Sequence, residues 1–111
     1  MTRMFHLVSI LSLLLISGIA AAGGDADVGK EKSAVCASCH GANGNSTNPQ
    51  FPILAGQYPE YIVRALVDYK SGARNNPIMK GFATALSRTD MEDLAAYFSS
   101  QASPLTSPTN W

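Results

Sequence analysis

The stretch that decides the fold is Cys36-Ala37-Ser38-Cys39-His40, in which two cysteines lie three positions apart and a histidine follows the second. Residues three apart on a helical turn project from nearly the same face, so both thiols can reach one flat ring. The adjacent His40 can then place its imidazole under the centre of that ring. This is the C-x-x-C-H pattern of haem attachment, in which a histidine binds the iron. The sequence therefore predicts one covalent haem c.

Other roles for the cysteine pair fit the sequence less well. A disulfide between Cys36 and Cys39 would close a very small loop and add little stability. A thioredoxin-like C-x-x-C motif lies in a βαβ unit, and no alternating apolar run predicts a strand here. A four-ligand zinc site needs further cysteines or histidines, and the chain after residue 22 has none besides these three residues. A thiol–disulfide protein is the alternative without haem.

Residues 1–22 are predicted to form a secretory signal peptide. Arg3 supplies the positive charge, an apolar run of about 14 residues covers 7–20, and Ala20-Ala21-Ala22 offers a cleavage site. The run is shorter than the roughly 20 residues of a membrane-spanning helix, although an uncleaved anchor is the alternative. We therefore expect export to the periplasm, outside the cytoplasm, where bacteria form the thioether bonds. We expect no membrane span in the mature protein.

The rest of the chain has the size and charge of one small domain. Without Arg3 it holds seven Lys and Arg against eight Asp and Glu, so no concentrated basic face predicts nucleic-acid binding. A domain this small often needs a cofactor to supplement its core. We predict a domain over 23–102 and a flexible tail over 103–111, which is rich in Ser, Thr and Pro.

Apolar residues at helical spacing predict an all-α domain of about four helices. The expected helical ranges are 25–35, 58–71, a short turn within 79–86, and 87–101. The last helix can begin at Ser87, paired with Asp90, or at Thr89, paired with Glu92, because both pairs have capping-box spacing. Loops rich in Gly, Asn and Pro are expected over 41–50 and 73–80.

The haem iron needs a second axial ligand, and the chain offers methionine. His6 lies in the leader, so ligation by two histidines of one mature chain is excluded. Met91 fits the apolar stripe of the last helix and is explained by core packing. Met79 follows Pro77 in a predicted loop, where its thioether can be aimed freely, so we favour Met79 over Met91. A His/Met pair raises the reduction potential of the iron.

Five landmarks, taken in order, make the chain resemble the class I cytochromes c, most closely the short bacterial periplasmic carriers with one or two haem domains. The landmarks are Cys36-Ala37-Ser38-Cys39-His40-Gly41, Phe51-Pro52-Ile53-Leu54-Ala55-Gly56-Gln57, Gly72-Ala73-Arg74-Asn75, Met79 and Asp93-Leu94-Ala95-Ala96-Tyr97-Phe98. The resemblance implies the class I cytochrome c fold, in which about four helices would wrap around one covalently bound haem and the first and last helices would cross near Gly29 and Tyr97 or Phe98. Two-haem members carry a second C-x-x-C-H, and this chain has one, so the single-domain form is expected.

The resemblance also implies roles for residues around the haem. Met79 would be the distal iron ligand, opposite His40. The backbone carbonyl of Pro52 would accept the imidazole N–H, which fixes the ring and strengthens the ligand. Polar groups expected near the haem carboxylates are Gln57, Tyr61 and Arg74. An ordinary core position for Tyr61 and a solvated loop charge at Arg74 are the alternatives.

These features predict a one-electron carrier, not itself an enzyme, in a respiratory or other redox chain. Its redox partner proteins would be a donor dehydrogenase or cytochrome complex and an acceptor oxidase or reductase. The apolar residues expected to bury the ring, and so to disfavour the ferric charge, are Ile53, Leu54, Ile62, Leu66, Leu94 and Phe98. The alternatives are a haem subunit of a periplasmic dehydrogenase, such as a sulfide-oxidising flavocytochrome, and a haem enzyme or gas sensor with an open iron site.

Overall fold

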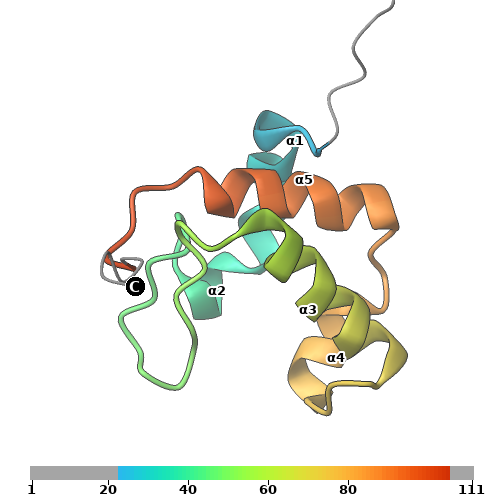
Figure 1. Ribbon diagram of the computed structural model, residues 1–111. Coiled ribbons are helices and arrows are strands. Elements are labelled where there is room, and N and C mark those ends of the chain that lie inside the picture. Colours follow the sequence, from blue (N-terminus) through green and yellow to red (C-terminus); the bar gives the residue numbers. More distant parts are fainter. Residues whose placement is uncertain (1–22, 106–111) are drawn as a thin grey trace, which may run out of the picture.

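The computed structural model describes residues 23–105, and this part of the chain is helical and contains no strand (Figure 1). Its elements are α1 (Ala26–Lys32), the 3-10 turn η1 (Ser33–Val35), α2 (Ala37–His40), α3 (Pro59–Ser71), α4 (Pro77–Ala83) and α5 (Arg88–Ser99). The all-α prediction is confirmed. The predicted signal peptide and the end of the predicted tail, 106–111, lie outside the described residues. Between residues 23 and 105, no helix has the length and apolar character needed to cross a membrane.

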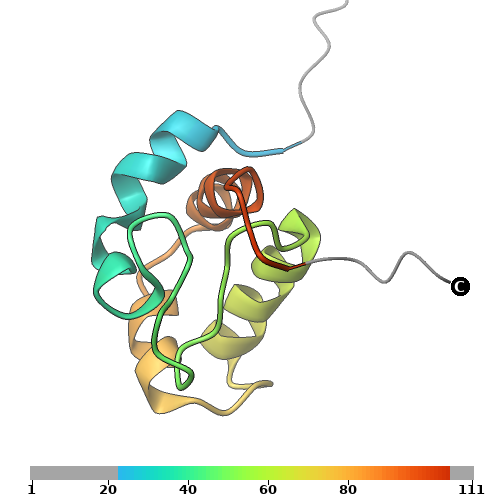
Figure 2. The ribbon, with the colours of Figure 1, turned by 90° about the vertical axis from the view of Figure 1, so that its left-hand side faces the viewer.

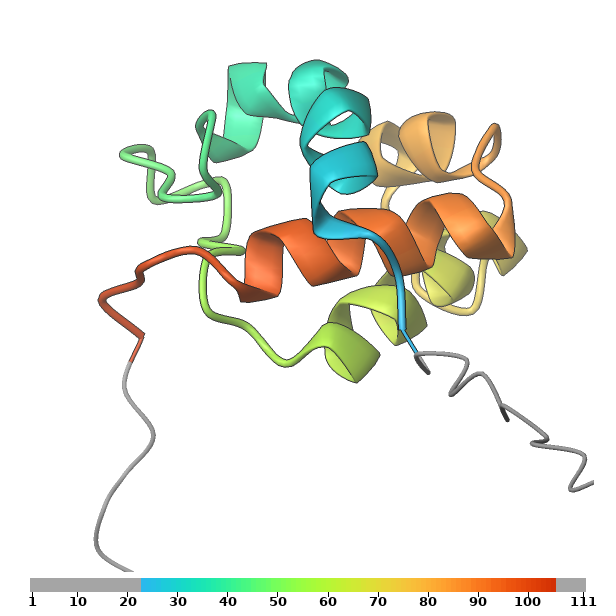
Figure 3. The ribbon, with the colours of Figure 1, turned by 90° about the horizontal axis from the view of Figure 1, so that it is seen from above.

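The first and last helices cross at Gly29. Helix α1 lies across α5 (Figures 1 and 3), and the two helices pack against each other. A Cβ atom built on Gly29 would overlap the carbonyl oxygen of Asp93 and lie 2.9 Å from the Cβ atom of Tyr97. Only glycine allows the two backbones to approach so closely, so the crossing implied by the resemblance is present.

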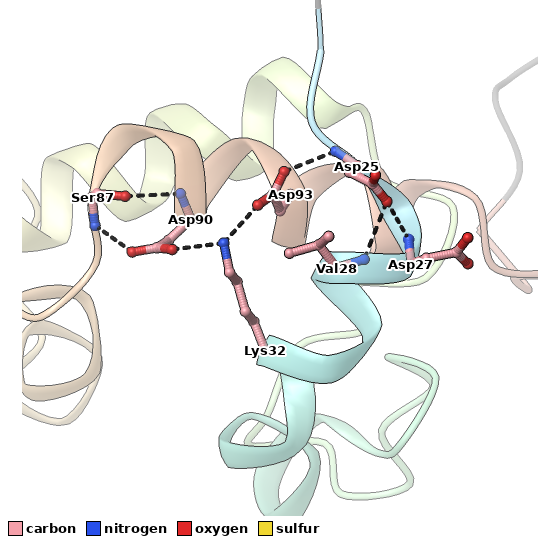
Figure 4. Close-up of polar contacts among 7 residues, drawn as sticks. All are labelled: Asp25, Asp27, Val28, Lys32, Ser87, Asp90 and Asp93. Carbon is pink, nitrogen blue, oxygen red and sulfur yellow. Dashed lines mark hydrogen bonds and ion pairs between the residues drawn. The ribbon is translucent and has the colours of Figure 1, made fainter.

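A cluster of charged groups fastens this crossing (Figure 4). The Nζ atom of Lys32 lies 2.7 Å from Oδ1 of Asp90 and 2.6 Å from Oδ2 of Asp93. The other oxygen of Asp93 accepts a hydrogen bond of 2.8 Å from the backbone N–H of Asp25. Hydrogen bonding to Lys32 is the main reason that the pKa of each of the two carboxyls lies below its usual value. The nearly buried Asp93 therefore carries a compensated charge.

Helix α5 begins at one of the two expected capping boxes. The Ser87 hydroxyl accepts from the Asp90 N–H, and the Asp90 carboxylate accepts from the Ser87 N–H. Because Asp90 also pairs with Lys32, the same carboxylate caps α5 and binds α1. Helix α3 also has the expected ends, with Pro59 in its first turn and Gly72 as a left-handed C-cap at φ 87°.

The short helical turn predicted within 79–86 is present but begins earlier, so the prediction of a loop at Met79 is wrong. Helix α4 begins at Pro77, so Met79 lies in its first turn. The Asn76 side chain accepts hydrogen bonds from the backbone N–H groups of Ile78 and Met79, which is the action of an N-cap. The Asn-Pro pair therefore starts a helix at this point.

The core lies between α3 and α5, and α4 packs against α3. The buried cluster of the core consists of Ile62, Val63, Met91, Leu94, Ala95, Tyr97 and Phe98. Met91 is only 2% exposed, as its place on the apolar stripe predicts. Turning the molecule by 90° shows the loop between α2 and α3 running beside the C-terminal half of α5 (Figure 2). Hydrogen bonds from Gly56 N–H to the Phe98 carbonyl and from Tyr97 Oη to the Ala42 carbonyl hold this loop in place.

Candidate functional site

A cavity of about 410 Å³ lies among α2, α3, α4, α5 and the 50–57 segment. This volume falls in the usual range of small-molecule and cofactor sites, roughly 300–1,000 Å³. The lining includes the six apolar residues that were expected to bury the ring, Ile53, Leu54, Ile62, Leu66, Leu94 and Phe98. Their side chains come from three separate parts of the chain, so the fold builds one apolar chamber out of distant segments.

The cysteine pair lies in the wall of this cavity. Cys36 is the residue before α2 and Cys39 lies within it, so both belong to a single helical turn. Neither cysteine forms a disulfide. Burial, and then the neighbouring Cys39, raises the pKa of the Cys36 thiol. Thiol–disulfide catalysts lower the pKa of their attacking cysteine, so this environment does not favour the thiol–disulfide alternative.

His40 ends the same turn and is held in one orientation. Its side chain is buried, and Nδ1 lies 2.8 Å from the carbonyl oxygen of Pro52. Because a carbonyl only accepts hydrogen bonds, the proton of the neutral ring lies on Nδ1, and Nε2 keeps a lone pair that can bind a metal. The Phe51 ring packs edge-on against the imidazole, with 6.4 Å between centroids. The hydrogen bond from His40 to the Pro52 carbonyl is the contact that the resemblance implied.

Only one of the two candidate methionines reaches the cavity. Met79 lines it from the first turn of α4, whereas Met91 lies in the core between α3 and α5. Two thiols, an imidazole and a thioether thus lie around one apolar chamber. This donor set fits a porphyrin that is attached covalently through the two thiols and whose iron is bound by the imidazole and the thioether.

The three polar residues expected near the haem carboxylates also line the cavity. Tyr61 is 52% exposed, so it is not an ordinary core residue. Arg74 donates from Nη1 to Tyr61 Oη at 3.4 Å, and its guanidinium carbon lies 4.8 Å from the centre of the Tyr69 ring. Gln57 accepts from the Tyr58 N–H through Oε1, which leaves its amide N–H groups for other partners. Arg74 is therefore held at the mouth and is not a freely solvated loop charge.

Sequence reasoning missed one wall of the cavity. Ile78 and Phe82 line it together with Met79, on the face of α4. These residues are spaced as on one face of a helix, so recognising Asn76-Pro77 as a helix start would have revealed them. Their apolar side chains line the cavity and do not belong to the core cluster.

Comparison with known proteins identifies the family. The family model for cytochrome c matches residues 26–102. Cytochrome c4 of Pseudomonas aeruginosa is 50% identical over 95 residues, which cover 86% of this chain and 47% of that protein. The cytochrome subunit of sulfide dehydrogenase of Chlorobaculum tepidum is 39% identical over 70 residues, or 63% of each chain.

The fold is also that of a solved relative. The crystal structure of reduced recombinant cytochrome c4 from Pseudomonas stutzeri matches with a TM-score of 0.68 and 46% identity, over 71% of this chain and 46% of that chain. The chain thus spans about half the length of the cytochrome c4 relatives that it matches. The covalent haem c prediction is confirmed, because Cys36 and Cys39 have the spacing that binds this cofactor in the matched family. The chain belongs to the cytochrome c family.

Proposed function

We propose that the protein carries single electrons between redox proteins of the periplasm and performs no catalysis of its own. The observation that carries this proposal is the meeting of His40 and Met79 in one apolar cavity beside the thioether cysteines. Two axial ligands from the chain leave no iron position for a substrate. Haem c, when bound, supplies an iron that alternates between the ferric and ferrous states.

His40 is proposed as the proximal ligand and Met79 as the distal ligand. The Pro52 carbonyl keeps the His40 proton on Nδ1, which directs Nε2 toward the metal and increases its basicity. Methionine ligation and apolar walls both favour the ferrous form, because sulfur is a soft donor and burial penalises the extra ferric charge. We expect a comparatively high reduction potential for these reasons.

Gln57, Tyr61 and Arg74 are proposed to bind the haem carboxylates. Arg74 offers a fixed guanidinium that can form paired hydrogen bonds to a carboxylate. Its stacking on Tyr69 and its contact with Tyr61 support this role, because both orient the guanidinium at the cavity mouth. The negative charge of the haem carboxylates would then be balanced by Arg74 where the cavity opens to solvent.

A redox titration of the haem-loaded protein tests the proposed function. A free carrier should give one reversible one-electron transition, and its ferrous form should bind carbon monoxide slowly, because the distal position is filled. Rapid binding of carbon monoxide by the native ferrous protein would instead favour the haem enzyme or gas sensor with an open iron site.

A second candidate function is the haem subunit of a periplasmic dehydrogenase. It is favoured by the likeness to the protein named as the cytochrome subunit of sulfide dehydrogenase. A fixed subunit should co-purify with a flavoprotein from its native periplasm and should stay bound at moderate salt. A shuttle should elute alone, because carrier contacts are small and transient.

A further inference from the structure

The carbonyl that orients His40 lies on a segment without helix or strand. Pro52 belongs to the loop between α2 and α3, so no helical hydrogen bond fixes its carbonyl oxygen at 2.8 Å from Nδ1 of His40. A loop is held in place where its polar groups meet the rest of the fold. The contacts that this loop makes therefore decide how firmly the Pro52 carbonyl stays on the imidazole.

The two arms of the loop are joined at Gly44. Its carbonyl oxygen accepts hydrogen bonds from the N–H groups of Leu54 at 2.8 Å and of Ala55 at 3.2 Å. A Cβ atom on Gly44, where φ is 81°, would lie 2.8 Å from the Ala55 nitrogen, so the two arms are in close contact. Because Leu54 follows Pro52 closely along the chain, a shift of Gly44 moves the segment that carries the Pro52 carbonyl.

Asn45, the next residue, ties this junction to the segment after α5. Its Nδ2 atom donates to the carbonyl oxygen of Ala102 at 2.9 Å, across 57 positions of the chain. Because a carbonyl only accepts hydrogen bonds, this contact requires the amide nitrogen and sets which way the side chain faces. The backbone oxygen of Asn45 also lies 3.0 Å from the place that a Cβ atom on Gly41 would occupy. Asn45 thus lies between the segment after α5 and the residue that follows His40.

The amide oxygen of Asn45 makes the hydrogen bond to Ala102 more informative. Oδ1 is buried and has no hydrogen-bond partner among residues 23–105. A buried acceptor without a partner destabilises a fold, and an apolar side chain of similar size would avoid this penalty. What the amide supplies instead is the one hydrogen bond to Ala102.

The second arm of the loop meets the same part of the chain. The N–H of Gly56 donates to the carbonyl oxygen of Phe98 at 3.0 Å. A Cβ atom on Gly56, where φ is 71°, would lie 2.5 Å from the Cβ atom of Ser103. The residues that follow α5 run beside this loop (Figure 2). They therefore contact the loop both before and after Pro52, at Asn45 and at Gly56.

The hydrogen bond to Pro52 affects how strongly His40 binds a metal. A carbonyl that accepts the Nδ1 proton increases the basicity of Nε2, and a more basic ligand favours the ferric iron because that state carries the higher charge. We propose that Asn45 is a positioning residue of the electron-transfer site, which keeps the loop closed and the Pro52 carbonyl on His40. This proposal rests on the proposed carrier function with His40 as the proximal ligand. It adds a residue that does not line the cavity and acts through His40.

Substitution of Asn45 in the haem-loaded protein tests this role. Asn45→Leu keeps the volume of the side chain and removes the donor. The Nδ1 proton of His40 should then exchange with solvent about tenfold faster, measured by NMR on isotope-labelled ferrous protein. The ratio of ferrous to ferric protein at a fixed solution potential should rise about threefold, because the imidazole becomes less basic. Asn45→Ala removes the same donor without apolar bulk and should give both changes.

Gln101→Leu is the matched control. The Gln101 amide also donates to a backbone carbonyl, at 3.0 Å, but that carbonyl belongs to Tyr97 in α5, so the bond does not reach the loop. Both readouts should stay within about twofold of the wild type. An equal change in the control would overturn the proposal. A lower melting temperature of the Asn45 variants with both readouts at wild-type values would also overturn it, since Asn45 would then only stabilise the fold.

The wild-type protein separates the two proposals. If it shows no reversible one-electron transition, the electron-carrier proposal itself fails. If it shows that transition while both Asn45 variants match it in proton exchange and in the ferrous-to-ferric ratio, only the positioning role of Asn45 fails. A change in the ratio without faster exchange of the His40 proton likewise contradicts the positioning role, because the effect would not pass through His40.

Discussion

Met79 and Met91 are both helical methionines, but they lie in different surroundings. Met79 lines the haem cavity, and Met91 is buried between α3 and α5. Replacing Met79 with Ala should abolish the methionine-to-iron absorption band of the ferric protein. The reduction potential should fall by on the order of a hundred millivolts, because a soft axial donor is lost. Optical spectra and redox titration of the purified variant measure both effects.

Met91→Leu is the control for this substitution. It replaces one core side chain with another of similar volume, so the band and the potential should stay close to the wild type, with a stability loss below about 1.5 kcal/mol. If Met91→Leu removes the band and Met79→Ala keeps it, the assignment of the distal ligand is wrong.

At this scale, the sequence predicted side-chain chemistry better than side-chain position. The C-x-x-C-H motif predicted the cysteines and His40, since covalent attachment demands that spacing. The contact of His40 with Pro52 was predicted only by the resemblance. The motif itself does not indicate which carbonyl, here 12 residues away, accepts the imidazole N–H. The contact of Arg74 with Tyr61 depends on how the loop after α3 folds back, and no local pattern records that.

At the scale of the helices, two glycines in helices have opposite surroundings. A Cβ atom on Gly29 would overlap the backbone of α5, whereas one on Gly81 would have no neighbour within 4 Å. Gly29→Ala should destabilise the fold by about 1–3 kcal/mol through forced separation of α1 and α5. Gly81→Ala should stabilise it by about 0.5–1 kcal/mol, because alanine favours the helix. Denaturant titration of both haem-loaded variants measures the change in the free energy of unfolding. A change of the same sign in the two variants would contradict the crossing geometry.

The charged cluster at the crossing should make the pairing of α1 with α5 sensitive to acid. Lys32 holds the pKa values of Asp90 and Asp93 below normal in the folded protein. The cluster therefore stabilises the fold above the unfolded carboxyl pKa of about 4, and this contribution is lost as the pH falls toward the lower folded values. Asp93→Asn should lower the melting temperature clearly at pH 7 and much less at pH 3.

Asp27→Asn provides the comparison for this prediction. Asp27 is an exposed carboxylate in the first turn of α1 and lies outside the cluster. Its loss should move the melting temperature only slightly at either pH. A pH-independent effect of Asp93→Asn would mean that its carboxylate charge is not what fastens the helices.

Helices that face the core were predicted within a few residues, whereas the start of the helix that faces the cofactor was not predicted. The stripe of α3 and the capping signals of α5 marked both elements within a few residues. Helix α4 has seven residues, and its apolar face lines the haem cavity. Reading Asn76-Pro77 only as a loop signal hid its start, although the same residues cap a helix.

At the scale of the whole molecule, the haem completes the hydrophobic interior. Apolar residues of α3, α4 and the 50–57 segment line one and the same cavity. Overall class and cofactor were predictable because the attachment motif and the helical stripes are local signals. The contacts that hold the loop between α2 and α3 against α5 were not, since they depend on how distant segments meet.

The central claim is that one porphyrin is bound covalently through Cys36 and Cys39. Intact-mass analysis and a reduced pyridine haemochrome spectrum should be measured on protein matured in a host that attaches haem c. The account predicts the mass of one haem added to each chain, a spectrum typical of two thioether bonds, and loss of both features in Cys36→Ala/Cys39→Ala. A colourless chain of unmodified mass with two titratable thiols would contradict it.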